Sequence, residues 1–152
     1  MQAKLESEFI FEAGASISMG GQIDWVELFI SSTGRVSRAP FLIASAVLIT
    51  LAVLYEAAVG PTLHLLTGWF VYPGLLYSGA CLLSRRLHDR GRSGWLAAIL
   101  ILALIVAWPV PNGPIDYAFC LVILWAIIEL GVMPGEQGAN RFGPNPVATA
   151  QA

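Results

Sequence analysis

Four long runs of apolar residues constrain the fold of this chain more than any other feature. They cover residues 39–59, 62–83, 95–111 and 115–133, which are 21, 22, 17 and 19 residues long. A helix rises about 1.5 Å per residue, so runs of this length match the hydrocarbon core of a bilayer, which is about 30 Å thick. The sequence therefore predicts an all-α polytopic membrane protein with four transmembrane helices.

The composition agrees with a membrane protein. The chain is 57% hydrophobic and only 12% charged, whereas soluble domains average roughly 45–50% and about 25%. This balance excludes a disordered chain, and a net charge of -2 argues against binding to nucleic acid. The two cysteines, Cys81 and Cys120, fit no metal-ligand spacing and are expected to be small apolar residues inside helices. We expect no metal and no cofactor.

The positions of the basic residues predict the orientation. All eight Lys and Arg residues lie before the first run, between the second and third runs, or after the fourth. None lies in the turns at residues 60–61 and 111–114. Because positively charged loops remain on the cytoplasmic side, both termini and the middle loop are predicted to be cytoplasmic.

The segment before the first run divides into two parts. Residues 1–22 are predicted to be a mobile tail, as are residues 147–152 at the other end, and residues 23–146 form the membrane domain. Residues 23–31 have the pattern of a short amphipathic helix. Two positions fit this helix, in the membrane interface or packed on the bundle. The polar face carries Asp24, Glu27 and Ser31, and the apolar face carries Trp25, Val26, Phe29 and Ile30.

The loop expected between the second and third runs has the sequence RRLHDRGRSGW, residues 85–95, with four arginines. Orientation in the membrane accounts for much of this charge, because arginines and a tryptophan are typical of helix ends. The adjacent His88 and Asp89 suggest acid–base chemistry, but neighbouring side chains seldom form a productive dyad and no nucleophile is recognisable beside them. We therefore expect no enzymatic activity.

This string, with GRVSRAPF at residues 34–41 and GANRFGPNP at residues 138–146, resembles the small bacterial inner-membrane proteins catalogued as domain of unknown function 805. The resemblance implies a multi-pass protein of the bacterial inner (plasma) membrane with no assigned activity, cofactor or catalytic residue. Two departures are visible. Family members often have further aromatic residues after the GR-x-x-R element, where this chain has Ala39-Pro40-Phe41-Leu42, and the N-terminal extension of about 20 residues lies outside the usual pattern.

The three motifs share arginine beside glycine, and in a four-helix bundle they emerge at the same end. We call the predicted cluster the arginine platform. With Asp89, Glu129 and Glu136 as counter-charges, its seven arginines keep a surplus of four positive charges. The platform is either a self-satisfied polar cap on the helix ends or a surface that binds anionic headgroups. Its residues are Arg35, Arg38, Arg85, Arg86, His88, Asp89, Arg90, Arg92, Asn140 and Arg141.

Apart from Asp116, which the helix dipole explains in the first turn of the fourth run, two acids lie within the apolar runs, which makes both of them candidates for function. Glu56 lies four residues before Gly60, at the outer end of the first run, and Glu129 lies near the inner end of the fourth. Their depths place them in opposite leaflets, which argues against a proton relay between them. We expect Glu56 to pair with His64 across the outer turn and Glu129 to pair with a platform arginine.

These observations predict a binding or scaffolding module that acts through its cytoplasmic face. Its expected partners are membrane lipids, including anionic headgroups, another membrane protein, or a second copy of itself. A small transporter or channel component is the alternative. Transport requires polar residues near the middle of the membrane, where the runs offer only Ser, Thr, Tyr and interrupted backbone.

Overall fold

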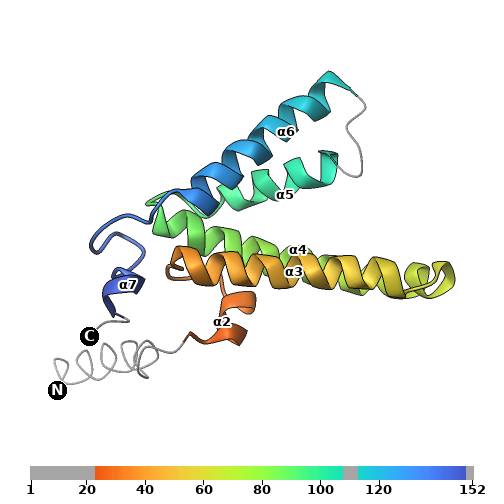
Figure 1. Ribbon diagram of the computed structural model, residues 1–152, viewed down its shortest axis with the longest axis horizontal. Helices are drawn as coiled ribbons and strands as arrows, with labels where there is room; N and C mark the ends of the chain where they lie inside the picture. Colours follow the sequence, from red (N-terminus) through yellow and green to blue (C-terminus); the bar gives the residue numbers. More distant parts are fainter. Residues whose placement is uncertain (1–22, 108–112, 150–152) are drawn as a thin grey trace, which may run out of the picture.

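The computed structural model describes residues 23–107 and 113–149 (Figure 1). The predicted tail at residues 1–22, the turn at 108–112 and the end of the chain at 150–152 lie outside the described residues. The described part is helical and has no strand. Its elements are α2 (Trp25–Ile30), α3 (Arg38–Ala58), α4 (Pro61–Asp89), α5 (Leu96–Ala107), α6 (Pro114–Ala126), the π-helix η1 (Ile127–Val132) that continues α6, and α7 (Pro146–Thr149).

Three of these helices are long and apolar enough to cross a membrane. They are α3, α4, and α6 together with η1, which are 21, 29 and 19 residues long. Many of their large side chains face outward, such as Trp69 and Phe70, which are 79% and 81% exposed. Such exposure is expected when lipid is the solvent. The fourth apolar helix, α5, has 12 described residues, so the fourth span stays a prediction.

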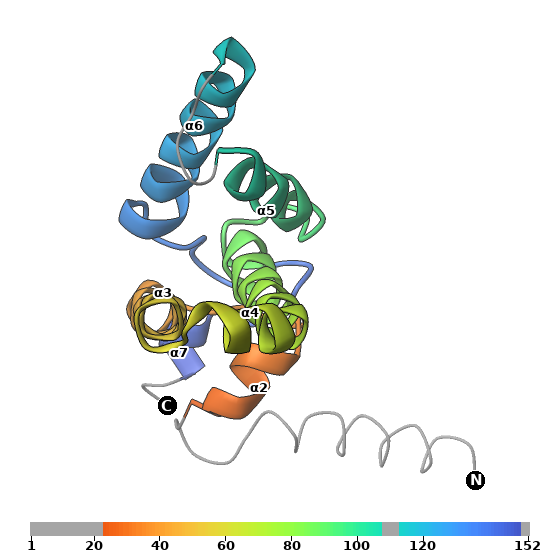
Figure 2. The ribbon, with the colours of Figure 1, turned by 90° about the vertical axis from the view of Figure 1, so that its right-hand side faces the viewer.

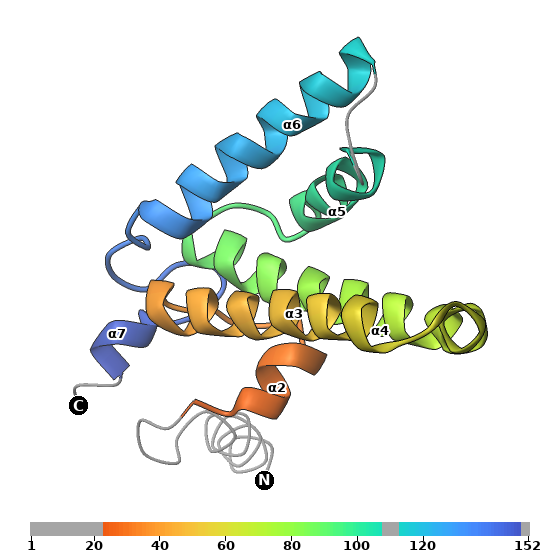
Figure 3. The same cartoon turned by 45° about the vertical axis from the view of Figure 1, so that its right-hand side comes forward.

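The long helices form two hairpins, α3 with α4 and α5 with α6. Figure 1 shows that the hairpins lie close together at one end and diverge toward the other, and Figures 2 and 3 show the same arrangement from two further directions. Contacts of α4 with α5 and of α3 with η1 join them. We call the end where the hairpins meet the platform end, because the three arginine motifs lie there.

Helix α4 is longer than the apolar pattern predicts. The predicted second span ends at Leu83, but the helix continues to Asp89, so the first half of RRLHDRGRSGW is helical and does not form a loop. The helix ends in a Schellman motif. Gly91 has a φ of +66°, and its N–H donates to the carbonyl of His88 (3.0 Å) while the N–H of Arg92 donates to that of Leu87 (2.8 Å).

The last predicted span agrees closely with the structure, but its end has an unexpected geometry. The predicted range, 115–133, matches α6 and η1 to within a residue at each end. The final six residues form a π-helix, and the N–H of Met133 donates to the carbonyl of Ile128, five residues earlier (3.1 Å). Short π-helical segments are rare and occur frequently at functional sites.

The buried apolar core lies at the platform end, where elements from both hairpins meet α2. Helix α2 packs on α4 through Leu28, which is 2% exposed, while Trp25, Val26 and Ile30 stay exposed. The N-terminal helix is thus packed on the bundle and also presents an apolar face. The core cluster consists of Leu28, Val36, Phe41, Ala44, Leu82, Leu87, Ala97, Leu100, Ala126 and Leu130.

Candidate functional site

The arginine platform is built around the carboxylate of Asp89. Arg86, one turn earlier on α4, donates from Nη1 to Oδ2 of Asp89. Arg35, before the start of α3, approaches the other oxygen, with its Nε and Nη2 at 3.1 and 3.0 Å from Oδ1. The side chains of Arg35, Arg86 and Asp89 are 1%, 0% and 3% exposed. Two buried guanidinium groups therefore share one buried carboxylate.

The remaining donors of Arg86 bind backbone carbonyls at the end of η1. Its Nε donates to the carbonyl of Leu130 (2.8 Å) and its Nη2 to that of Met133 (2.6 Å). The ring of Phe41 lies 5.9 Å from its Cζ. The last carbonyls of a helix have no partner within the helix, and a cation there also interacts favourably with the helix dipole. Arg86 thus joins the ends of α4 and η1.

Arg35 holds the segment that follows η1. It donates to the carbonyls of Glu136 (2.6 Å), Gly138 (2.7 Å) and Gly143 (3.3 Å). The loop it binds is closed by reciprocal backbone hydrogen bonds between Asn140 and Gly143, each 3.0 Å long. A single arginine from the GRVSRAPF motif therefore binds two backbone carbonyls of the GANRFGPNP motif.

Glu129 lies within η1 and pairs with platform arginines, as predicted. Its Oε1 accepts from Arg90 at 3.0 Å and from Arg92 at 3.1 Å, and its side chain is 11% exposed. Arg90 also donates to the carbonyl of Pro134 (2.5 Å), and Arg38 donates to that of Val132 (3.1 Å). The end of η1 is consequently surrounded by arginine donors, which satisfy its carbonyl groups.

Arg85 faces away from Asp89 and holds α2. It donates from Nε to the carbonyl of Ser31 (2.8 Å) and from Nη2 to Oε1 of Glu27 (2.7 Å). Tyr77 supports the same contact through a hydrogen bond to the carbonyl of Ile30 (2.8 Å). Glu27 is thus an interaction partner that sequence reasoning missed. The sequence feature that could have indicated this role is the position of Glu27 on the polar face of the amphipathic segment.

His88 and Asp89 do not act on each other. Nδ1 of His88 donates to the carbonyl of Gly34 (3.1 Å), and its ring stacks on Phe142 with a centroid distance of 3.9 Å. Asn140 donates to the carbonyl of His88 (3.0 Å) and to Oε2 of Glu136 (2.9 Å). The two residues of the suggested acid–base pair therefore make separate structural contacts, His88 with Gly34 and Phe142, and Asp89 with two arginines.

Two glycines lie at points of close packing in the platform, and sequence reasoning assigned no role to either of them. A Cβ on Gly135 would lie 2.1 Å from Oδ2 of Asp89, and a Cβ on Gly94 would lie 2.1 Å from Oγ of Ser84. Side chains at these positions would displace the groups that they meet. The backbone after η1 reaches Asp89 because residue 135 has no side chain.

The exposed part of the platform surrounds the loop after α4. We call Arg90, Arg92 and Arg141 the cationic rim: Arg90 and Arg92 flank Gly91, and Arg141 donates to the carbonyl of Gly91 (3.5 Å). Arg90 and Arg92 have 23% and 45% of their side chains exposed, and Arg141 is exposed. A guanidinium has five N–H donors, and among the described residues Arg92 and Arg141 each donate one hydrogen bond.

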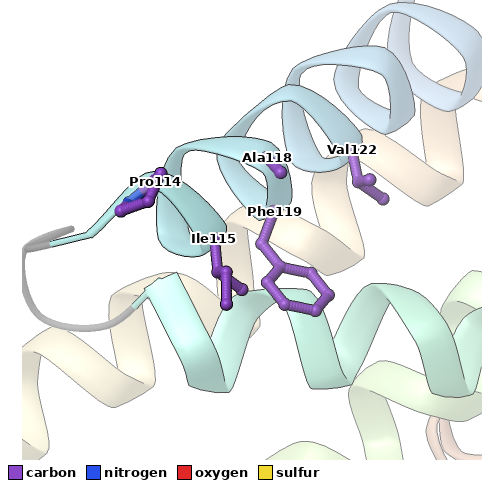
Figure 4. A pocket seen from close by; sticks show the side chains of 5 residues that line it. All are labelled: Pro114, Ile115, Ala118, Phe119 and Val122. Carbon is purple, nitrogen blue, oxygen red and sulfur yellow. The ribbon is translucent and has the colours of Figure 1, made fainter.

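The apolar pockets of the described residues do not have the chemistry of an active site. Figure 4 shows an open pocket on α6, lined by Pro114, Ile115, Ala118, Phe119 and Val122. A second pocket between α3 and α4 is apolar apart from Ser78. Small-molecule sites usually add a few convergent polar groups to an apolar pocket, and these linings suit hydrocarbon chains better.

The fold and the site define an all-helical protein with membrane-length apolar helices that are joined at one end by an arginine–carboxylate network. Residues 29–144 match the model of the family described as "Protein of unknown function (DUF805)", and the chain belongs to this family. The predicted resemblance is thus confirmed.

Two curated relatives extend the comparison. The chain is 32% identical over 122 residues to the uncharacterised protein YiiR of Escherichia coli (strain K12), an alignment that covers 74% of this chain and 84% of YiiR. The YiiR protein of Escherichia coli O157:H7 gives the same values. No solved structure matches this chain.

Proposed function

We propose that the protein is a four-span protein of the bacterial inner membrane, with both termini and the platform end in the cytoplasm. The distribution of Lys and Arg, the three membrane-length helices and the bacterial relatives support this assignment. A reporter that is active only in the periplasm tests it. The reporter is expected to be active when inserted at Asn112 and inactive when fused after Ala152, and the reverse pattern would contradict the orientation.

The molecular function that the geometry supports best is a binding module for anionic phospholipids, with the cationic rim as the binding surface. The observation that carries it is that Arg90, Arg92 and Arg141 lie around one loop, and that Arg92 and Arg141 each donate one hydrogen bond among the described residues and have further guanidinium donors. Phosphate oxygens are suitable acceptors for such donors. The cationic rim is therefore proposed to bind the phosphate group of a lipid.

The depth of the rim in this orientation agrees with a headgroup site. Trp95, three residues after Arg92, is 63% exposed, and Arg92 lies with its Cζ 5.4 Å from the ring of Trp125. Tryptophan is enriched at the level of the headgroups. Helix α2 presents Trp25, Val26 and Ile30 outward, which supports an interfacial position for its apolar face.

The proposal divides the predicted platform into two parts. Arg35, Arg85 and Arg86 are buried by their internal partners and stabilise the fold. The rim contributes the binding, at about 1 kcal/mol for each arginine near the surface. This proposal assigns each of the two alternatives for the platform, a self-satisfied cap and a binding surface, to a different set of arginines.

Lipid titration of the detergent-solubilised protein, followed by native mass spectrometry, tests this function. The double variant Arg92→Gln with Arg141→Gln should bind phosphatidylglycerol about 30-fold more weakly, because it loses about 2 kcal/mol. Arg38→Gln is the matched control, since it removes an exposed arginine outside the rim, and phosphatidylcholine is the control lipid. Equal phosphatidylglycerol affinities of the double variant and the wild type would refute the proposal.

A further inference from the structure

A second polar cluster lies at the turn between α3 and α4, at the opposite end of this hairpin from the platform. Glu56 comes from the last turn of α3, and His64 and Tyr72 come from α4. Nε2 of His64 lies 3.4 Å from Oε2 of Glu56, which confirms the predicted contact between these residues. Tyr72 is the third member: its hydroxyl donates to Oε1 of Glu56 and lies 2.6 Å from Nε2 of His64.

Four atoms with lone pairs that could bind a metal ion, from three side chains, converge in this cluster. The imidazole nitrogen of His64 lies nearly equidistant from the two carboxylate oxygens of Glu56, at 3.5 and 3.4 Å. Both separations are long for a hydrogen bond. They are, however, the separations between ligands of one metal ion, because bonds of about 2.0–2.2 Å place neighbouring ligands about 2.8–3.6 Å apart.

The surroundings fix these side chains and leave one side open. The hydroxyl of Tyr55 lies 2.8 Å from Oγ1 of Thr67, and the ring of Tyr55 packs edge-on against that of Tyr72. A Cβ on Gly68 would lie 3.3 Å from the Tyr72 ring, so glycine allows the ring to lie against the helix. The side chains of His64 and Glu56 are 35% and 48% exposed, which gives an ion access.

The charge at this end also favours a cation. Residues 39–84 contain no Lys or Arg, so no fixed cation from this hairpin opposes the carboxylate of Glu56. Among the described residues, no group of three His, Cys, Asp or Glu side chains could hold a metal. The phenol oxygen of Tyr72, which lies 2.6 Å from Nε2 of His64, would be the third protein ligand, and water would complete the coordination, as in metal sites with an open position.

We propose that Glu56, His64 and Tyr72 bind a divalent first-row transition ion at the outer end of the α3–α4 hairpin. Imidazole nitrogen with carboxylate oxygen suits Zn²⁺ and its neighbours in the series. The imidazole binds through the lone pair of Nε2 and carries its hydrogen on Nδ1. Tyr72 moves outward on binding, because its hydroxyl lies closer to Glu56 and His64 than two ligands of one ion do. This inference is independent of the lipid site at the platform end.

Calorimetric titration of the full-length protein in detergent, after removal of any affinity tag, tests the site with Zn²⁺ as the probe. We expect one ion per chain. Glu56→Gln and His64→Gln should each weaken binding by at least about tenfold, on the order seen when a metal ligand loses its support, and Tyr72→Phe should have a smaller effect. Binding of Co²⁺ should give visible absorption bands that the same variants lose.

Asp116→Asn is the matched control, because it removes one carboxylate at the N-terminus of α6 and leaves the cluster intact. It should bind Zn²⁺ as the wild type does. Thermal unfolding without metal shows whether each variant is folded, and Tyr72→Phe keeps the aromatic packing if the other two are not. Failure of the wild type to bind Zn²⁺ at micromolar concentration, or equal binding by wild type, Glu56→Gln and Tyr72→Phe, would overturn the proposal.

Discussion

Asp89→Asn is the substitution that most directly tests how the platform end is held together. The change keeps the size of the side chain but removes the carboxylate that, within residues 23–107 and 113–149, is the one paired with Arg35 and Arg86. Both guanidinium groups are at most 1% exposed, so water cannot replace the lost partner. Removing one member of a buried ion pair costs about 3–5 kcal/mol, because the other charge stays buried.

Two arginines lose their shared partner in this variant, but the expected loss of stability is that of one buried ion pair and not of two. Arg35 and Arg86 keep their hydrogen bonds to backbone carbonyls, and the asparagine oxygen still accepts one hydrogen bond. The free energy of unfolding should therefore fall by about 3–5 kcal/mol. An equilibrium titration from mild detergent into sodium dodecyl sulfate, followed by circular dichroism, measures this loss.

Glu27→Gln provides the matched comparison. It removes a carboxylate that also pairs with an arginine of α4, but the side chain of Glu27 is 50% exposed. Exposed pairs are worth about 0–1 kcal/mol. If the two variants lose the same stability to within about 1 kcal/mol, burial does not set the cost and the reasoning about Asp89 is wrong.

Three further predictions concern single contacts. Gly135→Ala should destabilise the fold by about 1–3 kcal/mol, because the new Cβ meets the Asp89 carboxylate. Gly74→Ala is the control: a Cβ there meets nothing within 4 Å, so the change should stabilise α4 by up to about 1 kcal/mol. An equal loss of stability in both variants would contradict the close approach of residue 135 to Asp89. Glu129→Gln should lower the free energy of unfolding by about 1–3 kcal/mol, and an unchanged melting temperature would show that its pairs with Arg90 and Arg92 contribute little. A double-mutant cycle of Glu56→Gln and His64→Gln in metal-free buffer should give a coupling of about 1 kcal/mol or less, and additive effects would remove the interaction.

The sequence predicted the helical class, three helices long and apolar enough to cross a membrane, and the meeting of the arginine motifs, because these depend on apolar length and on which helix ends share a side. It also predicted the partners of Glu56 and Glu129, since few groups of opposite charge lie at the same depth. The assignment to the family followed from the motifs. Each of these inferences needs only the order of residues along the chain.

The features that sequence reasoning missed depend on contacts between distant segments. The apolar pattern ends at Leu83, yet α4 continues because Arg85 and Arg86 find partners on α2 and η1 that no local pattern reveals. The role of Gly135 depends on its distance from Asp89, 46 positions earlier in the chain. Tyr72 reaches the Glu56 cluster only because its long side chain extends back along the helix toward His64.

The length of α4 determines where the platform stands relative to the lipid. Its 29 residues measure about 44 Å, whereas the hydrocarbon layer is about 30 Å thick and needs about 20 residues. The apolar run in α4 ends at Leu83, so Arg85 and Asp89 lie about 3–9 Å beyond its end along the helix axis. Removing one turn from the apolar part of α4 would draw these charges toward the hydrocarbon by about 5 Å. In the proposed membrane orientation, these last residues of α4 carry the charged network past the end of the apolar run, so that it forms outside the bilayer interior.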